Sequence, residues 1–219
     1  MISQSRFEKA RIDYARKWRL LDQTLYAMCK KYPGHETEAK IRAKLWIIGR
    51  TYATGIERKI TASGSQGSSL SRLTKHFFKN RIKLKNIFEN ISGIKEPITE
   101  DMLRLIILAH GQLVSLIRPL LYNSTASRSF CSKYLHFHNP VIPIYDSLAS
   151  AALRMLYHWK PSFQIFTLPK SIDEEYCRFL FRFWQFYLDV QTIFKRKPLT
   201  VKELDHYLIM DKQESSMHL

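Results

Sequence analysis

Lys133 and Asp146 are the two residues whose types and spacing best suit chemistry in this sequence. They lie in one stretch, residues 129–147, which reads SFCSKYLHFHNPVIPIYDS. An amine such as that of Lys133 can attack an electrophilic carbon and form an imine if burial lowers its pKa. A carboxylate such as that of Asp146 can stabilise positive charge in a reacting ring and orient an attacking water. Lys133 and Asp146 are therefore the candidates for these two roles.

The elements around this pair must place both side chains at one site. A short helix over residues 128–138 is expected to carry Lys133, and residues 139–145 contain two prolines that exclude regular helix. Asp146 then begins an apolar helix over residues 147–157, where the helix dipole favours its ionised form. The alternative interpretation is that Asp146 only caps this helix, as aspartate often does.

The order of lysine, Pro-containing extended stretch and aspartate at a helix start resembles the helix–hairpin–helix DNA glycosylase superfamily. The resemblance covers residues 128–156. Ser129 and Cys131 stand where the family hairpin has glycines, and the interval from Lys133 to Asp146 is several residues shorter than in the bifunctional members. More loosely, the whole chain looks like a bacterial group of small glycosylase-like proteins. That group includes a phage-defence enzyme that removes glucosylated hydroxymethylcytosine from viral DNA.

This resemblance implies cleavage of the N-glycosidic bond of a flipped, modified base in double-stranded DNA, leaving an abasic site. Asp146 would stabilise the cationic sugar. Lys133 would either form an imine at C1′ and permit strand cleavage, or contact a phosphate at the surface. The resemblance further implies a monomer in the bacterial cytoplasm with no cofactor, no metal and no membrane partner.

A second segment, residues 44–58, is expected to contribute to the base pocket. Gly49 and Gly55 each cost roughly 1 kcal/mol inside an apparent helix, so close approach of another element or a ligand would justify them. Aromatic rings would stack on a base, and charged groups would bind its polar edge. The alternative is that Tyr52 is core and that Glu57 forms an ion pair on the surface in the neighbourhood of Arg58. The base-pocket candidates are Trp46, Arg50, Tyr52, Glu57, Tyr145 and His136.

The charge of the chain indicates a polyanionic partner. Its 35 Lys and Arg against 19 Asp and Glu give a net charge of +16, with a pI near 9.8. A basic amphipathic helix over residues 70–91 is the best candidate for sequence-independent phosphate contacts. The DNA-backbone candidates are Arg72, Lys75, Lys79, Arg81, Lys83, Lys85, Arg128, Ser129, Ser132 and His138.

The fold class predicted is all-α, a glycosylase-like bundle of two intimately packed helical subdomains. Seven glycines and eight prolines in 219 residues are too few for a turn-rich β fold. Residues 1–62 and the C-terminal helices are expected to form one half of a single unit, residues 70–160 the other, and residues 211–219 a frayed tail. The predicted helices span residues 5–31, 36–60, 70–91, 99–121, 128–138, 147–157, 173–194 and 200–210.

Other classes of protein are less well supported. Cys29, Cys131 and Cys177 are too scattered for a thiolate metal site, and no uncharged apolar run approaches the roughly 20 residues that a membrane span needs. The aromatic residues of 176–187 are expected to be core rather than a nucleobase platform. The hypotheses left open are a base-excision repair glycosylase, a non-catalytic basic DNA-binding module, and a membrane-surface or protein-interaction domain. An Arg-plus-His ribonuclease is weakly supported, because the spacings do not fit.

Overall fold

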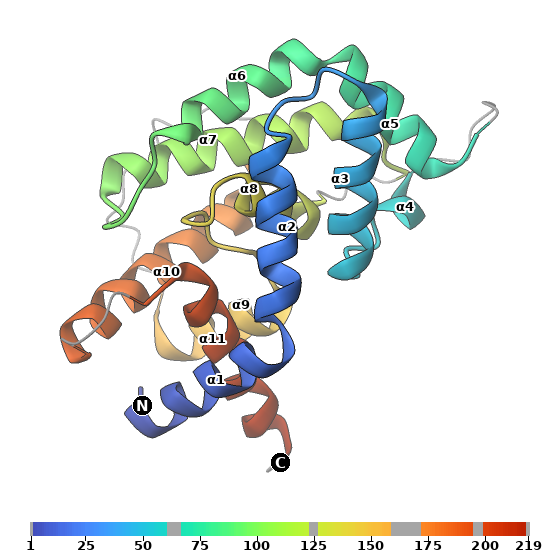
Figure 1. The fold of residues 1–219 in the computed structure, drawn as a ribbon. Helices are drawn as coiled ribbons and strands as arrows, with labels where there is room; N and C mark the ends of the chain where they lie inside the picture. Colours follow the sequence, from blue (N-terminus) through green and yellow to red (C-terminus); the bar gives the residue numbers. More distant parts are fainter. Residues whose placement is uncertain (1, 61–66, 123–126, 159–171, 195–198, 218–219) are drawn as a thin grey trace.

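The prediction of an all-α chain is confirmed by the computed structural model. The structure describes residues 2–60, 67–122, 127–158, 172–194 and 199–217, and within these ranges it contains helices but no strand (Figure 1). Parts of the predicted loop 61–69 and of the turn 123–127 lie outside the described residues.

The first six helices are α1 (Gln4–Lys17), α2 (Arg19–Lys31), α3 (Glu38–Thr51), α4 (Ile56–Lys59), α5 (Ser69–Lys79) and α6 (Arg81–Ser92). They are followed by α7 (Glu100–Ile117), a 3₁₀ turn (Arg118–Leu120), α8 (Arg128–His138), α9 (Ser147–Leu156), α10 (Glu174–Ile193) and α11 (Val201–Met217).

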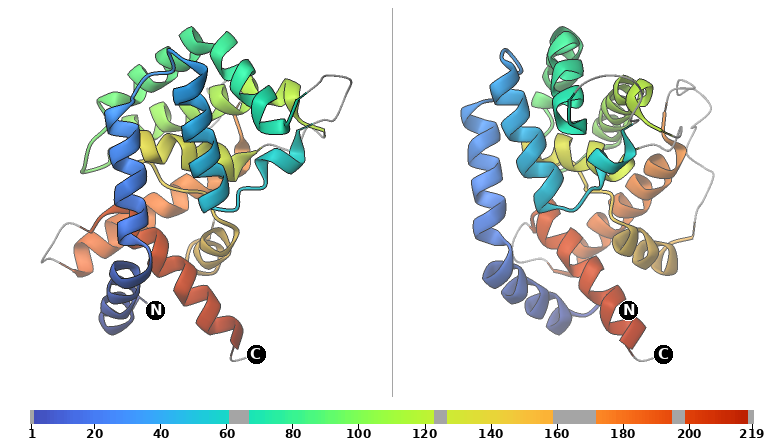
Figure 2. Two further views of the ribbon diagram at one scale, coloured as in Figure 1. Left: turned by 45° about the vertical axis from the view of Figure 1, so that its right-hand side comes forward. Right: turned by 90° about the vertical axis from the view of Figure 1, so that its right-hand side faces the viewer.

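The helices pack around α8, which lies in the middle of the molecule. The pair α6 and α7 runs along one edge, with α2, α3 and α5 beside it, and α8 packs against α2, α3 and α7 (Figure 1). At the opposite edge α9 packs against α10 and α11, and α1 packs against α11, so both termini lie there (Figures 1 and 2). Within residues 1–62, therefore, α1 contacts the C-terminal helices, whereas α2 and α3 contact α8.

The core is built mainly from aromatic and aliphatic side chains. Eight consecutive residues of α8, Phe130 to Phe137, are buried, as expected for a helix surrounded by others. The aromatic residues of α10 are largely core, as the sequence predicted: Tyr176, Phe179, Phe181, Phe183, Phe186 and Tyr187 are all buried.

Two of the predicted N-terminal helices are each divided in two. The helix expected over residues 5–31 breaks at Trp18, whose backbone leaves the helical region between α1 and α2. The helix expected over residues 36–60 ends at Thr51, since Ala53 and Gly55 adopt positive φ values of 45° and 65°. This turn explains Gly55, because only glycine occupies that conformation without strain.

Further corrections concern the basic segment and the C-terminus. The helix expected over residues 70–91 is divided at Asn80, whose side chain donates a hydrogen bond to the carbonyl of His76 at 2.9 Å. Ile82, an apolar residue of this segment, is 70% exposed rather than buried. The last helix runs to Met217 rather than Met210, and Asp211 within it pairs with Arg6 at 2.8 Å.

The helix α7 and its 3₁₀ extension, Glu100–Leu120, are long and apolar enough to cross a membrane by length and composition alone. Half of its most apolar window is buried inside the protein, and α7 packs against α6, α8 and α10. These contacts are those of a core helix.

Candidate functional site

Lys133 and Asp146 line the same cavity. This cavity, here called the Lys133 cavity, has a volume of about 410 Å³, within the range of roughly 300–1,000 Å³ typical of small-molecule sites. Five segments that are distant in the sequence meet there. Its lining residues are Asp13, Lys17, Trp18, Thr51, Tyr52, Ala53, Lys133, Ile144, Asp146, Lys202, Asp205, His206, Ile209 and Met210.

Lys133 projects from the buried helix α8 and is only 5% exposed. Its Nζ donates a hydrogen bond to Ser129 Oγ at 2.9 Å and lies 5.6 Å from the centre of the Tyr52 ring. Burial lowers the pKa of the Lys133 ammonium, while the nearby carboxylates of Asp146 and Asp205 partly oppose this shift. The direction of the shift is the one that an amine nucleophile requires.

Asp146 is the N-cap of α9, as the sequence predicted. Its Oδ1 accepts a hydrogen bond from the backbone N–H of Leu148 at 2.9 Å. The other oxygen, Oδ2, accepts no hydrogen bond from any residue that the structure describes. One carboxylate thus caps the helix with one oxygen and lines the cavity, so the capping and catalytic interpretations are compatible.

The extended segment between these residues is bonded to α8 along its length. Ser132 Oγ accepts a hydrogen bond from the N–H of Tyr145 at 2.9 Å, and His136 Nδ1 lies 2.7 Å from the carbonyl oxygen of Ile142. The hydroxyl of Tyr176 donates to the carbonyl of Pro143 at 2.9 Å. These hydrogen bonds hold the segment in place against α8 and α10, and so fix the position of Asp146 relative to Lys133.

Aromatic rings form one wall of the cavity. Tyr52 is held by its hydroxyl, which donates to the buried carboxylate of Asp22, and Asp22 also accepts a bond from Tyr14 at 3.0 Å. Trp18 stacks on Tyr52 with ring centres 6.3 Å apart and an interplanar angle of 27°. Trp18 is 37% exposed, so it extends this aromatic wall to the surface.

Helix α11 supplies two charged residues that the sequence analysis did not single out. Lys202 Nζ donates to Asp205 Oδ2 at 3.0 Å, and it lies 4.9 Å from the centre of the Tyr52 ring. Both residues are buried. A signal was present in the sequence, because Asp205 shares a helical stripe with the apolar residues Val201 and Leu208.

Most of the predicted base-pocket residues lie outside this cavity. Tyr52 lines it, but Arg50 stacks over the exposed ring of Trp46 at 4.6 Å and forms two hydrogen bonds with Glu57, of 3.0 and 3.1 Å. Glu57 therefore forms an ion pair outside the cavity, as the alternative expected, but its partner is Arg50 rather than a group near Arg58. Trp46 and Arg50 lie one helical turn apart on α3, and with Glu57 of α4 they form a cluster outside the cavity.

The other two predicted base-pocket residues, His136 and Tyr145, are held by contacts with neighbouring elements outside the cavity. His136 is fully buried between Ile142 and the hydroxyl of Tyr26, and burial lowers its pKa to about 3. Tyr145 lies beside the cavity-lining Asp146, and its ring packs under the guanidinium of Arg128 at 5.0 Å. Neither residue lines the Lys133 cavity.

Four of the predicted DNA-backbone residues are engaged within the protein. Arg128 forms a bidentate pair with Asp173 at 2.7 to 2.9 Å. Ser129 and Ser132 make the hydrogen bonds described above. His138 is packed against Phe88, and its Nε2 lies 3.2 Å from the Nζ of the buried Lys44. These contacts hold all four side chains against other parts of the protein.

The other six predicted backbone residues lie on α5 and α6: Arg72, Lys75, Lys79, Arg81, Lys83 and Lys85. Helix α6 lies at the edge of the molecule opposite to α9 and α11 (Figures 1 and 2). Nearer the cavity, three exposed basic residues flank Trp18 at the break between α1 and α2: Arg16, Lys17 and Arg19. Sequence reasoning missed this run because it treated residues 5–31 as one helix.

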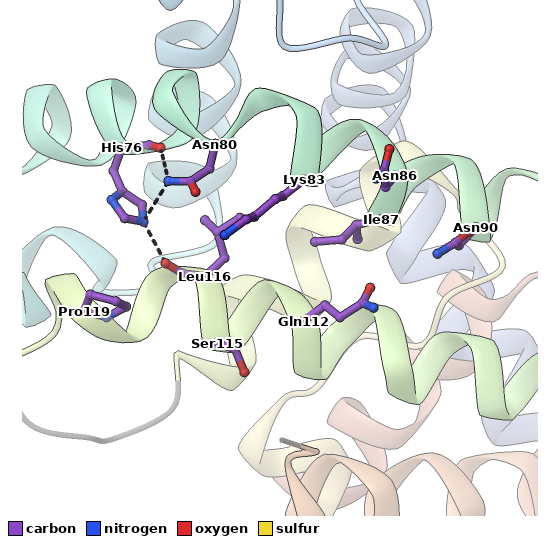
Figure 3. Close-up of a pocket in the computed structure, with 10 residues that line it drawn as sticks. All are labelled: His76, Asn80, Lys83, Asn86, Ile87, Asn90, Gln112, Ser115, Leu116 and Pro119. Atoms are coloured by element: carbon purple, nitrogen blue, oxygen red, sulfur yellow. Dashed lines mark hydrogen bonds between the residues drawn. The ribbon is translucent and has the colours of Figure 1, made fainter. Parts of the chain in front are cut away.

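A second cavity, of about 590 Å³, lies between α6 and α7 (Figure 3). His76 Nε2 lies 2.7 Å from the carbonyl of Leu116, and Lys83 extends from α6 towards α7. This cavity brings together amides, one histidine and one lysine but no carboxylate, so it lacks the lysine–aspartate combination of the Lys133 cavity.

No group of three or more His, Cys, Asp or Glu side chains suited to a metal ion occurs in the part of the chain that the structure describes. All three cysteines are buried free thiols, and burial raises the pKa of Cys29 to about 11 and that of Cys131 and Cys177 to about 12. They are therefore poor nucleophiles near neutral pH.

Comparisons with protein-family models, with curated proteins and with solved structures find no match to this chain.

Proposed function

We propose that this protein is a DNA glycosylase that cleaves the N-glycosidic bond of a flipped, modified base. The observation that carries this proposal is the position of Lys133 and Asp146 in one cavity with the aromatic wall of Tyr52 and Trp18. These are the two residues on which the resemblance to the helix–hairpin–helix glycosylases rests.

Asp146 is proposed to act on the sugar. As the base departs, positive charge develops on the deoxyribose ring, and a carboxylate next to it lowers the energy of that state. Asp146 lies at the start of α9, where the partial positive charge of the helix N-terminus faces its side chain. Its Oδ2 is available for the ring, since Leu148 bonds to Oδ1 only.

The basic run around Trp18 is proposed to bind the DNA next to the cavity. Arg16, Lys17 and Arg19 can neutralise phosphates irrespective of sequence, and the net charge of +16 favours this encounter. When one base leaves the duplex, the faces of the neighbouring bases become exposed. An aromatic ring such as that of Trp18 can stack on one of these faces.

The substrate that we favour is glucosylated hydroxymethylcytosine in phage DNA, which makes the protein an anti-phage defence enzyme. Three lysines and three aspartates line the Lys133 cavity, and such groups can hydrogen-bond the hydroxyls of a sugar attached to a base. A bare pyrimidine has fewer polar groups to match this lining. Repair of a damaged base is the alternative use of the same site.

One observation favours a second candidate, a non-catalytic helical DNA-binding module. Asp146 makes a complete N-cap hydrogen bond, which alone would explain an aspartate at this position.

Abasic-site formation on three DNAs tests the proposal: unmodified, hydroxymethylated and glucosyl-hydroxymethylated. We expect heat- or alkali-labile sites only in the last, with wild type and with the exposed-residue control Asp101→Asn, and none with Asp146→Asn. Asparagine also caps helices well, so this variant should fold and bind DNA. Equal cleavage by Asp146→Asn would leave Asp146 as a cap only. No cleavage by wild type would contradict the favoured substrate, and no base release from a wider lesion panel would contradict the reaction.

Lys133 decides whether the strand is also cut. If its amine attacks C1′, borohydride will trap a covalent protein–DNA adduct, and Lys133→Ala will abolish this adduct. Abasic sites without an adduct indicate hydrolysis by water and a binding role for Lys133.

A further inference from the structure

Asp205 is a buried carboxyl with one oxygen unpaired. It is 1% exposed and lines the Lys133 cavity from α11. Lys202 bonds to its Oδ2, but Oδ1 accepts no hydrogen bond from any residue that the structure describes. A buried polar atom without a partner destabilises the folded state, so such an atom in a cavity calls for an explanation.

The groups around Asp205 do not satisfy Oδ1. On α11 itself, Lys202 is engaged with Oδ2, and Lys133 on α8 bonds to Ser129. From α1, Asp13 faces α11 but pairs with His206 and with Lys17. The remaining groups that interact electrostatically with Asp205 are the carboxylate of Asp146 and the phenols of Tyr52 and Tyr26.

A proton on Oδ1 would remove the negative charge of this buried carboxylate. Burial raises the pKa of Asp205; Lys202 works against that shift, and the negative charge of Asp146 adds to it. Two carboxyls at one cavity thus occupy different environments, one capping a helix start and one enclosed beside a lysine. Pairs of this kind divide into a charged partner and a proton donor in enzymes that cleave glycosidic bonds.

We propose that Asp205 is the general acid of this site, donating its Oδ1 proton to the departing base while Asp146 stabilises the sugar. This assignment rests on the glycosylase proposed above. It adds a catalytic residue on α11, an element that the resemblance did not cover.

The step balances with water as the only co-reactant. The C1′–N bond breaks with its electron pair going to the base, and the O–H bond of Asp205 breaks as its proton moves to that base. Water adds to C1′, and the proton that it releases restores the acid form of Asp205. The net change is hydrolysis of one N-glycosidic bond, giving a neutral base and an abasic sugar.

The test compares the pH dependence of single-turnover base release by wild type, Asp205→Asn and Asp101→Asn on the DNA that wild type cleaves. A general acid must carry its proton, so the wild-type rate should fall at high pH. Asp205→Asn should be at least about 100-fold slower at the wild-type optimum and should lack this descending limb. Asp101→Asn should keep the wild-type profile.

The alternatives give different results. A structural role alone would lower the rate of Asp205→Asn equally at every pH and leave the limb in place, which would overturn the assignment. If wild type and Asp101→Asn cleave but Asp205→Asn equals them, only this inference fails. If wild type releases no base, the proposed function fails, and the catalytic role of Asp205 fails with it.

A second measurement uses wild type alone, in case Asp205→Asn does not fold. Carboxyl carbons of ¹³C-labelled aspartate report ionisation residue by residue. We expect Asp205 to lose its proton at a pH above about 3.9, the usual pKa of aspartate. Loss of this proton at or below that pH would overturn the assignment whatever the activity.

Discussion

The hydroxyl of Ser132 joins the residue before Lys133 to the residue before Asp146. Its oxygen accepts a hydrogen bond from the N–H of Tyr145 at 2.9 Å, and Ser132 also donates to the carbonyl of Ser129 at 3.1 Å. Ser132 is the immediate neighbour of Lys133, and Tyr145 is the immediate neighbour of Asp146. This one contact therefore sets how the helix α8 and the start of α9 present their side chains to the cavity.

Ser132→Ala should destabilise the protein and impair base release. It leaves the N–H of Tyr145 unpaired, at a cost of about 1–3 kcal/mol in the free energy of unfolding. Chemical denaturation measures this loss. The matched control is Ser150→Ala, since Ser150 is equally buried but its hydroxyl has no partner in the described structure. Equal losses in the two variants would show that the Ser132 bond contributes nothing.

Trp18→Ala should weaken binding to DNA that contains an extrahelical base. Stacking of one base on an aromatic ring contributes about 1–3 kcal/mol by alanine substitution, so a loss of about 5- to 150-fold in affinity is expected. Fluorescence anisotropy measures it. Trp46→Ala is the control, because Trp46 is 47% exposed but lies outside the Lys133 cavity. If Trp46→Ala weakens binding and Trp18→Ala does not, the base is bound elsewhere.

Neutralising Arg16 and Arg19 should reduce the salt dependence of DNA binding. Each phosphate contact contributes about −0.9 to the slope of log K against log salt, so the slope of Arg16→Gln/Arg19→Gln should be shallower by about 2. Binding titrations at several salt concentrations measure it. The comparison variant is Arg81→Gln/Lys83→Gln on α6. If that pair carries the change instead, the docking surface is the one predicted from residues 70–91.

The sequence predicted the helical class, the core role of α10 and the arrangement around Lys133 and Asp146, because local signals control these features. Prolines at 140 and 143 exclude helix, and aspartate before an apolar helix caps it. It did not predict the breaks at Trp18 and Asn80, since neither residue is a helix breaker by propensity. Asp205 and Lys202 were missed because they join the cavity only through tertiary packing of α11 against α9 and α1.

Acid should unfold the protein by protonating its buried histidines. Burial lowers the pKa of His35 to about 2, of His136 and His138 to about 3, and of His110 to about 4. In the unfolded chain these imidazoles have a pKa of about 6.5. Below that pH the unfolded state binds more protons than the folded state, so the free energy of unfolding falls as the pH falls. At pH 5 each neutral imidazole accounts for a loss of about 2 kcal/mol, from about 1.36 kcal/mol per pH unit.

Urea unfolding from pH 7.5 to 4.5 measures this dependence. The free energy of unfolding should be nearly constant above about pH 7 and decline steeply below about 6.5, with an uptake of several protons on unfolding. Replacing His110, whose Nδ1 has no partner among the described residues, by Gln should reduce the slope by one proton. If the free energy of unfolding stays constant down to pH 5, these histidines are protonated in the folded state. That result would contradict the close packing of His35 and His138 around the ammonium of Lys44.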